Sequence, residues 1–193
     1  MQKLNVGGEK GKGKFPKGWE IVDIRKGAHV RMDIQAGPLP YADNTIDAVY
    51  TSHTLEHILA HKIDFVLKEF HRVLKPGCRL RVVVPDIDIA IKAYVEGDIE
   101  FLRYSSNPAK MECIPDHPLG YLNCWFHTYY IVDDQHQLGG HVFAYNYEVM
   151  ETLIKKAGFS TVEKRSYKDC SHIFRKCDAP RWANCSIYVE AEK

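Results

Sequence analysis

The stretch Arg-Leu-Arg-Val-Val-Val-Pro-Asp, residues 79–86, decides the class of fold. Leu80 and the three valines after Arg81 form a nearly continuous apolar run, which is typical of a strand buried on both faces of a parallel sheet. Pro85 and Asp86 close the run, and aspartate is a preferred cap for a following helix. The stretch therefore predicts a parallel strand that leads directly into a helix.

One helix is predicted before this strand in the sequence, and another after it. Before it, apolar residues recur at helical spacing until Lys75-Pro76-Gly77, a stop signal. After it, Asp86 caps a helix whose apolar side chains are expected to share one face. These predicted faces consist of Ile63, Val66, Leu67, Phe70 and Leu74 in the first helix, and Ile87, Ile91, Tyr94 and Val95 in the second.

Further strands and a helix follow the same pattern of alternation. We expect strands at residues 2–6, 21–24, 30–34, 46–50, 160–166 and 185–191, and a helix capped by Asn146 that ends at Gly158. The glycine-rich loop 7–18 is too short for a full crossover helix, so the first helix should be stunted or missing. Strands that alternate with helices predict an α/β fold with a doubly wound, mostly parallel sheet.

Length and composition limit the class of protein. The 193 residues suit a single domain, in which residues 97–140 lose the regular pattern and should carry short helices and a lid. The net charge of +1 gives no support for binding nucleic acid. We find no apolar run long enough for a membrane span and no signal peptide, and therefore expect a cytoplasmic protein with reduced cysteines. Cys170, His172, Cys177 and Cys185 lack Cys-x-x-Cys spacing, and no metal is expected.

Small and polar residues follow the predicted strands at the edge where α/β sheets bind ligands. Gly7 and Gly8 let a ligand approach the backbone, and Asp23 can accept hydrogen bonds from two ribose hydroxyls. Asp33 can accept from an adenine amino group. Taken singly, each is most often a turn or cap residue, but together they predict a nucleotide-type site, with further polar residues at Ser52, His53 and Asp86.

The glycine loop indicates which cofactor this site would bind. Glu9 stands at the third position of the turn, where a carboxylate would repel a pyrophosphate. S-adenosylmethionine has no phosphate and carries two cationic groups, so the loop favours it over NAD. Lysines 10, 12, 14 and 17 leave open a phosphate-bearing nucleotide as the alternative, although a solvated loop is the simpler interpretation of these lysines.

Five stretches together resemble the class I S-adenosylmethionine-dependent methyltransferases, in particular the methyltransferase type 11-like branch. The likeness is ordered over residues 2–86, weakens through 87–140 and returns at His141–Phe159. The stretches before residue 87 are Leu-Asn-Val-Gly-Gly (4–8), Gly-Trp-Glu-Ile-Val-Asp-Ile (18–24), Leu-Pro-Tyr-Ala-Asp-Asn-Thr-Ile-Asp (39–47), Ser-His-Thr-Leu-Glu-His (52–57) and Arg-Val-Leu-Lys-Pro-Gly-Cys-Arg-Leu (72–80).

The resemblance implies a Rossmann-like sheet with an antiparallel last strand and a lid insertion after the fifth strand. It also assigns cofactor contacts. Gly7 and Gly8 would line the methionine part, and Asp23 and Ile24 would hold the ribose and adenine. Asp33 and Ile34 would meet the adenine edge, with Ser52 and His53 near the sulfonium. Glu9 and Cys78 depart from the glycines that the family usually has at these positions.

Methyl transfer to a hydroxyl or ammonium needs a proton acceptor, and histidine titrates near neutrality. The candidates are His53, His57 and His141; for His57, a packed or capping role is the alternative. The acceptor pocket is expected to include Asp86, His136 and Tyr145, unless the aromatic stretch is only an amphipathic lid. We expect a small-molecule acceptor, and family analogy alone suggests a saccharide precursor. The alternative is a methyltransferase-like protein that binds or regulates without catalysis.

Overall fold

The computed structural model describes residues 1–8, 15–106, 116–126, 130–131 and 138–193. Its main sheet contains seven strands, in the order β3-β2-β1-β4-β5-β9-β8. The bounds of these strands are β1 Lys3–Val6, β2 Glu20–Asp23, β3 Val30–Arg31, β4 Ile46–Ser52, β5 Leu74–Pro85, β8 Thr161–Arg165 and β9 Ser186–Glu192. A separate antiparallel pair joins β6 (Tyr130–Ile131) to β7 (Leu138–Gly139).

The strand directions confirm the expected sheet. Strands β1 to β5 pair in parallel, whereas β9 runs antiparallel to both of its neighbours, β5 and β8. Strand β1 lies between β2 and β4, so the strand order reverses at β1 and β4. In open α/β sheets this reversal point is where a ligand crevice forms, outside the carboxyl ends of the strands. The fold is therefore Rossmann-like, with its switch point at the glycine pair.

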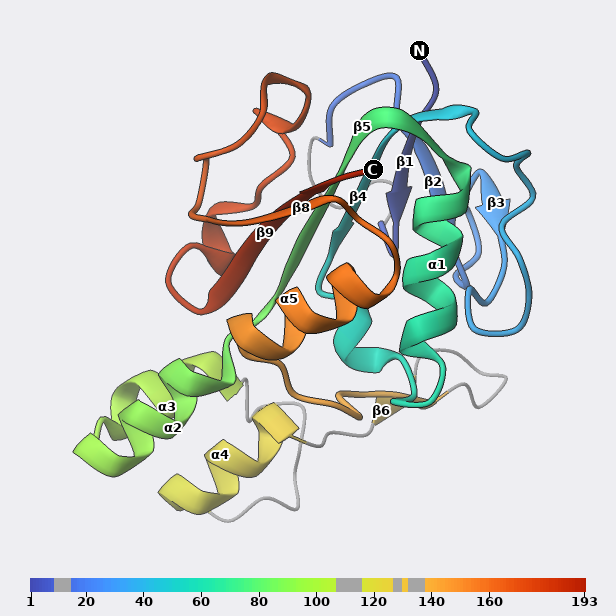
Figure 1. The fold of residues 1–193 in the computed structure, drawn as a ribbon. Helices are drawn as coiled ribbons and strands as arrows, with labels where there is room; N and C mark the ends of the chain where they lie inside the picture. Colours follow the sequence, from blue (N-terminus) through green and yellow to red (C-terminus); the bar gives the residue numbers. More distant parts are fainter. Residues whose placement is uncertain (9–14, 107–115, 127–129, 132–137) are drawn as a thin grey trace.

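Two helices cover one face of the sheet. Figure 1 shows α1 (Ile63–Val73) and α5 (Tyr147–Lys156) side by side on that face. The Asn146 side chain accepts a hydrogen bond from the backbone of Val149 at 3.0 Å, as expected for the cap of α5. The buried side chains of these helices join the main core: Ile63, Val66, Leu67, Phe70, Val73, Met150 and Ile154.

Aromatic side chains cover the opposite face. Trp19, Tyr50 and Phe174 contact one another there, with ring centroids 6.0–6.4 Å apart. Phe174 comes from the segment that follows β8, which includes the short 3-10 turns η3 (His172–Phe174) and η4 (Pro180–Trp182). Buried Arg81 of β5 binds this segment to the sheet through the carboxylates of Asp178 and Glu190. The core therefore contains side chains from this irregular segment as well as from the helices.

The region after β5 forms a helical cluster at the carboxyl end of that strand (Figure 1). It contains α2 (Ile87–Glu96), α3 (Ile99–Ser106) and α4 (Pro118–Phe126), which contact one another. The expected short helices within residues 97–140 are therefore present. None of the helices in the described ranges is long and apolar enough to cross a membrane.

Three local expectations need correction. The apolar residues predicted to share one face of α2 do lie on one side of it, but that side is largely exposed: Val95 is 77% and Ile91 41% exposed, whereas Ala90 and Ala93 are buried. Small side chains let α2 approach the neighbouring helices closely, and this packing overrides the larger apolar residues. The strand predicted at 30–34 stops at Arg31. Strand β5 begins at Leu74, so the Lys-Pro-Gly stretch opens a strand and α1 ends at Val73.

The short β3 and the missing first helix have local causes. Asp33 Oδ1 accepts a hydrogen bond from the backbone of Gln35 at 2.9 Å, a local turn that competes with pairing in the sheet. Between β1 and β2 the described residues 7, 8 and 15–19 form no helix, in agreement with the expectation for this loop. Residues 9–14, which include Glu9 and three of the loop lysines, lie outside the described residues.

Candidate functional site

The glycine turn after β1 leaves no room for a side chain at either position. Gly7 has φ +78°, and a Cβ there would lie 1.8 Å from Thr54 Oγ1. A Cβ at Gly8 would lie 2.1 Å from Asn5 Nδ2. The Gly7 backbone N–H donates to Val22 O at 2.8 Å, which fixes the turn beside β2. The turn therefore needs glycine for its backbone angle and for its close packing on Thr54 and Asn5.

Asp23 lies at the end of β2, next to this turn, and is 5% exposed. Both carboxylate oxygens accept hydrogen bonds from the Arg25 guanidinium, at 2.9 and 2.8 Å. The same guanidinium donates to Gly7 O at 3.2 Å. Arg25 thus links the glycine turn to Asp23 in a bidentate, charge-assisted pair. Asp23 ends β2, as the sequence predicted, and its carboxylate is paired with Arg25; its role in binding ribose stays a prediction.

The other predicted cofactor residues surround this corner of the sheet. Ile24 follows Asp23 and is half-buried, and its carbonyl accepts from Arg31 Nε at 3.0 Å. Asp33 is exposed in the turn after β3, while Ile34 is 8% exposed and belongs to the core. Ser52 ends β4 and is half-buried, with its carbonyl accepting from Thr54 Oγ1 at 3.2 Å. Strand ends far apart in the sequence therefore meet at one edge.

His53 leaves the end of β4 with an uncommon backbone conformation, φ +50°. Its ring stacks on Trp182, with centroids 3.6 Å apart, and its Nε2 lies 2.9 Å from Ser186 Oγ. Its Nδ1 points towards Glu56, 3.3 Å from Oε1. A non-glycine residue at positive φ marks a backbone position that its surroundings must hold. Here those surroundings turn the imidazole towards a buried carboxylate.

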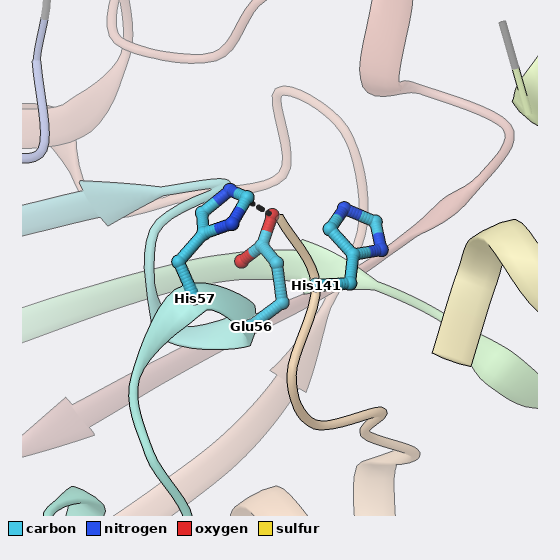
Figure 2. A group of neighbouring side chains, drawn as sticks. All are labelled: Glu56, His57 and His141. Carbon is cyan, nitrogen blue, oxygen red and sulfur yellow. Dashed lines mark ion pairs between the residues drawn. The ribbon is translucent and has the colours of Figure 1, made fainter. Parts of the chain in front are cut away.

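Glu56 is the centre of a group of histidines. It lies in the 3-10 turn η1 (Leu55–His57), and its side chain is 2% exposed. Figure 2 shows its carboxylate between the imidazoles of His57 and His141. His57 Nε2 lies 3.8 Å from Glu56 Oε1, and the centroids of the two rings are 5.3 Å apart. With His53, three imidazoles therefore surround one buried carboxylate.

Two of the three histidine candidates are brought together by contacts across the chain. Val142 donates its backbone N–H to Glu56 O at 2.8 Å, which ties the segment after β7 to η1. His57 Nδ1 lies 2.7 Å from Gly140 O, and His141 Nδ1 lies 3.2 Å from Trp125 O of α4. The carbonyls fix the orientation of both rings. The cluster therefore depends on the sheet, on α4 and on the segment between β7 and α5.

The cluster is electrostatically coupled. Burial raises the pKa of Glu56, but the contact with His53 and the charges of His53, His57 and His141 outweigh it and bring that pKa to about 2. Burial lowers the pKa of His141, although Glu56 acts in the opposite direction. Glu56 is thus an ionised carboxylate at neutral pH, and burial favours the neutral form of His141.

The residues predicted to bind the acceptor have other contacts. Asp86 caps α2, accepting from the Asp88 backbone at 3.1 Å, which is the ordinary role of an aspartate after a strand. Tyr145 is 1% exposed and its hydroxyl donates to Leu55 O at 3.1 Å, so it supports η1 from within the core. His136 lies outside the described residues.

Two residues of this region were not singled out from the sequence. Arg25 gave no signal, because an exposed arginine two residues after an aspartate is common. Glu56 stood within the stretch 52–57 but received no role. The spacing His-x-x-Glu-His was the available signal, since a single turn can bring positions three and four apart to one side. Cys170, His172, Cys177 and Cys185 form no cluster of potential ligands within the described part of the chain.

Comparisons with known proteins show which family and which fold the chain resembles. Residues 17–82 match the family described as "Methyltransferase domain". A methyltransferase from Methanosarcina mazei, described as S-adenosylmethionine-dependent, has a TM-score of 0.57 at 15% identity, over 100% of this chain and 92% of its own. One from Archaeoglobus fulgidus has a TM-score of 0.54 at 11% identity, over 100% of this chain and 86% of its own. No curated protein sequence matches the chain.

A third solved structure has a bound ligand. It is the 1,6-didemethyltoxoflavin-N1-methyltransferase of Burkholderia thailandensis, solved with 1,6-didemethyltoxoflavin and S-adenosylhomocysteine. Its TM-score is 0.51 at 12% identity, over 100% of this chain and 70% of its own. At such identities the structures establish a shared fold, whereas the family match covers the segment from the end of the glycine-rich loop to the middle of β5.

Proposed function

We propose that this chain, a class I S-adenosylmethionine-dependent methyltransferase by its family match and its fold, methylates a small-molecule acceptor at the carboxyl ends of β1 and β4. One observation carries the proposal. The glycine turn after β1, Asp23 at the end of β2 and His53 after β4 lie at the point where the strand order reverses. This is where the sheet geometry itself creates a ligand crevice.

The chain's own residues fit the cofactor in position and chemistry. Gly7 and Gly8 offer backbone without side chains, and Asp23 offers a carboxylate for the ribose hydroxyls. Ile24, Asp33 and Ile34 would lie along the adenine, with Ser52 near the sulfonium. The cofactor supplies the chemistry, an electrophilic methyl group on a cationic sulfur. The protein binds it, orients the acceptor and excludes water.

The histidine cluster supplies proton acceptors near the end of β4. A hydroxyl or ammonium acceptor must lose a proton when it is methylated. The imidazoles of His53, His57 and His141 surround Glu56, the buried glutamate of η1. Helix α4, which holds His141 through Trp125 O, lies within the insertion at 97–140. We infer that this insertion forms one wall of the acceptor site. Saccharide precursors belong among the first acceptors to test.

One observation favours a second candidate function. Arg25 occupies both carboxylate oxygens of Asp23, the group that should bind ribose. A protein whose ribose acid stays paired in this way would bind partners or regulate them without methyl transfer. Cofactor binding without turnover on any acceptor pool would support this candidate. Transfer of labelled methyl to any acceptor would exclude it.

A calorimetric titration of the full chain with S-adenosylmethionine tests the principal proposal. We expect saturable binding, and we expect Asp23→Ala to weaken it about 10- to 100-fold through loss of charge-assisted hydrogen bonds. Asp43→Ala is the matched control, because Asp43 precedes β4 at the opposite edge and its side chain is 69% exposed. No binding at millimolar cofactor, or equal affinity of the Asp23 variant and the wild type, would overturn the assignment.

A further inference from the structure

Glu56 is a buried carboxylate whose oxygens lack the hydrogen bonds that normally accompany burial. Glu56 as a whole is 1% exposed, yet neither Oε1 nor Oε2 has a hydrogen-bond partner among the described residues. The nearest side-chain nitrogens belong to imidazoles, with His53 Nδ1 3.3 Å and His57 Nε2 3.8 Å from Oε1. A buried ionised carboxylate is costly unless it is paired or coordinates a metal. Both carboxylate oxygens are therefore available to a further ligand, such as a metal ion.

The imidazoles of His57 and His141 are oriented as metal ligands usually are. In each ring Nδ1 faces a backbone carbonyl, Gly140 O for His57 and Trp125 O for His141. A carbonyl can only accept, so Nδ1 carries the hydrogen and Nε2 carries the lone pair in the neutral ring. Metal-binding histidines commonly use one nitrogen for the ion and donate the other N–H to a carbonyl or carboxylate.

The donor atoms are close enough for one ion to bind all three residues. One ligand atom from each of Glu56, His57 and His141 lies within 4.8 Å of the others. Figure 2 shows the three side chains next to one another. A tetrahedral zinc site with bonds of about 2.1 Å places its ligand atoms about 3.4 Å apart. The His57–Glu56 distance of 3.8 Å is already near this value, so small side-chain rotations complete the site. His57 is 29% exposed, which leaves an ion a route inwards.

We propose that Glu56, His57 and His141 bind one divalent transition-metal ion of the zinc type. Two imidazoles and one carboxylate are borderline ligands, which suit zinc and its neighbours better than magnesium or calcium. Three protein ligands leave a further coordination position open, as in catalytic zinc sites and unlike closed structural ones. His53, whose Nδ1 contacts Glu56 Oε1, holds the carboxylate from the other side as a positioning residue. Because His57 and His141 are ligands once the ion is bound, His53 is then the one candidate of the three left to accept a proton.

The location links this ion to the acceptor, a step that rests on the proposed function. Thr54, two residues before Glu56, packs against Gly7 of the predicted cofactor turn, and its hydroxyl donates to Val6 O at 3.4 Å. The ion would therefore lie near the predicted cofactor turn. An ion there selects acceptors that present an oxygen ligand, so hydroxyl-bearing small molecules are the substrate class that the site fits best.

Zinc binding by the full chain tests the proposal directly. After removal of bound metal by a chelator, calorimetric titration with Zn²⁺ should show one ion per chain. Glu56→Gln keeps the shape and removes the charge, and should weaken binding more than about 100-fold, as should His141→Gln. His61→Gln is the matched control, because His61 is exposed four positions after His57 and outside the cluster. Near-ultraviolet circular dichroism checks that each variant is folded.

Two results would overturn the proposal: wild-type protein that shows no saturable Zn²⁺ binding, or affinity unchanged in both variants. If Glu56→Gln does not fold, the result for His141→Gln decides. Binding of S-adenosylhomocysteine to the same samples keeps the two hypotheses apart. Cofactor binding without zinc binding refutes the ion site and leaves the methyltransferase assignment intact. Zinc binding without cofactor binding supports the ion site and refutes the cofactor assignment.

Discussion

Replacing Arg81 with methionine should destabilise the domain, because Arg81 is fully buried and binds the segment between β8 and β9 to the sheet. Its guanidinium donates to Asp178 Oδ1 and Oδ2 at 2.9 and 2.6 Å and to Glu190 Oε1 at 3.0 Å. It also donates to the carbonyls of Ser166 and Asp169, at 3.1 and 3.2 Å. Methionine retains much of the side-chain length and removes every one of these donors.

The magnitude follows from the two carboxylates left behind. Asp178 and Glu190 have side chains only 2% and 0% exposed. Removing one partner of a buried ion pair costs about 3–5 kcal/mol, since an uncompensated charge remains in the interior. Glu190 keeps its hydrogen bonds from Ser171, which favours the middle of that range. A loss of about 4 kcal/mol lowers Tm by about 8–16 °C for a chain of this length.

Urea denaturation of Arg81→Met, followed by tryptophan fluorescence and far-ultraviolet circular dichroism, measures this loss. Lys68→Met is the control, because the Lys68–Asp64 pair lies on an exposed helix face and should contribute less than about 0.5 kcal/mol. Adding Asp178→Asn and Glu190→Gln to Arg81→Met should recover part of the stability. If Arg81→Met loses less than about 1 kcal/mol relative to the control, the buried-charge argument is refuted.

Three further predictions concern single positions. Gly7→Ala should cost more than about 2 kcal/mol in urea denaturation, because φ is +78° and the new Cβ would collide with Thr54; a cost below about 1 kcal/mol would contradict this. Asp86→Ala should cost about 1 kcal/mol through loss of the α2 cap, whereas Asp86→Asn should be nearly neutral, and equal losses in the two variants would argue against capping. Burial, followed by the charge of Lys193, lowers the pKa of His71, so unfolding should bind protons and stability should fall as pH drops below about 6.5. His71→Gln should flatten Tm between pH 7 and pH 5, and an unchanged slope would exclude His71 as its source.

The sequence by itself determined the elements whose signals are local. The apolar run 82–84 predicted the buried strand β5, and the Asn146 cap located the start of α5, because capping and side-chain period act within a few residues. Polar residues at strand ends predicted the site edge, since parallel strands place their carboxyl ends together. The antiparallel β9 and the cofactor roles came from the family resemblance; the structure confirms the direction of β9, and the cofactor roles stay predictions.

Tertiary structure decided what local pattern leaves open. A helical period identifies apolar residues but not the partner they meet, so α2 buries Ala90 and Ala93 and leaves Val95 in solvent. Glu56 lies beside His141 only because the segment after β7 folds back on η1. A hydrogen bond between His57 Nδ1 and Gly140 O, 83 residues apart in the sequence, holds the two segments together. Neighbours in the sequence determine the propensity for a helix or a strand. Burial and long-range contacts determine the environment of a side chain, and the candidate ion site depends on that environment.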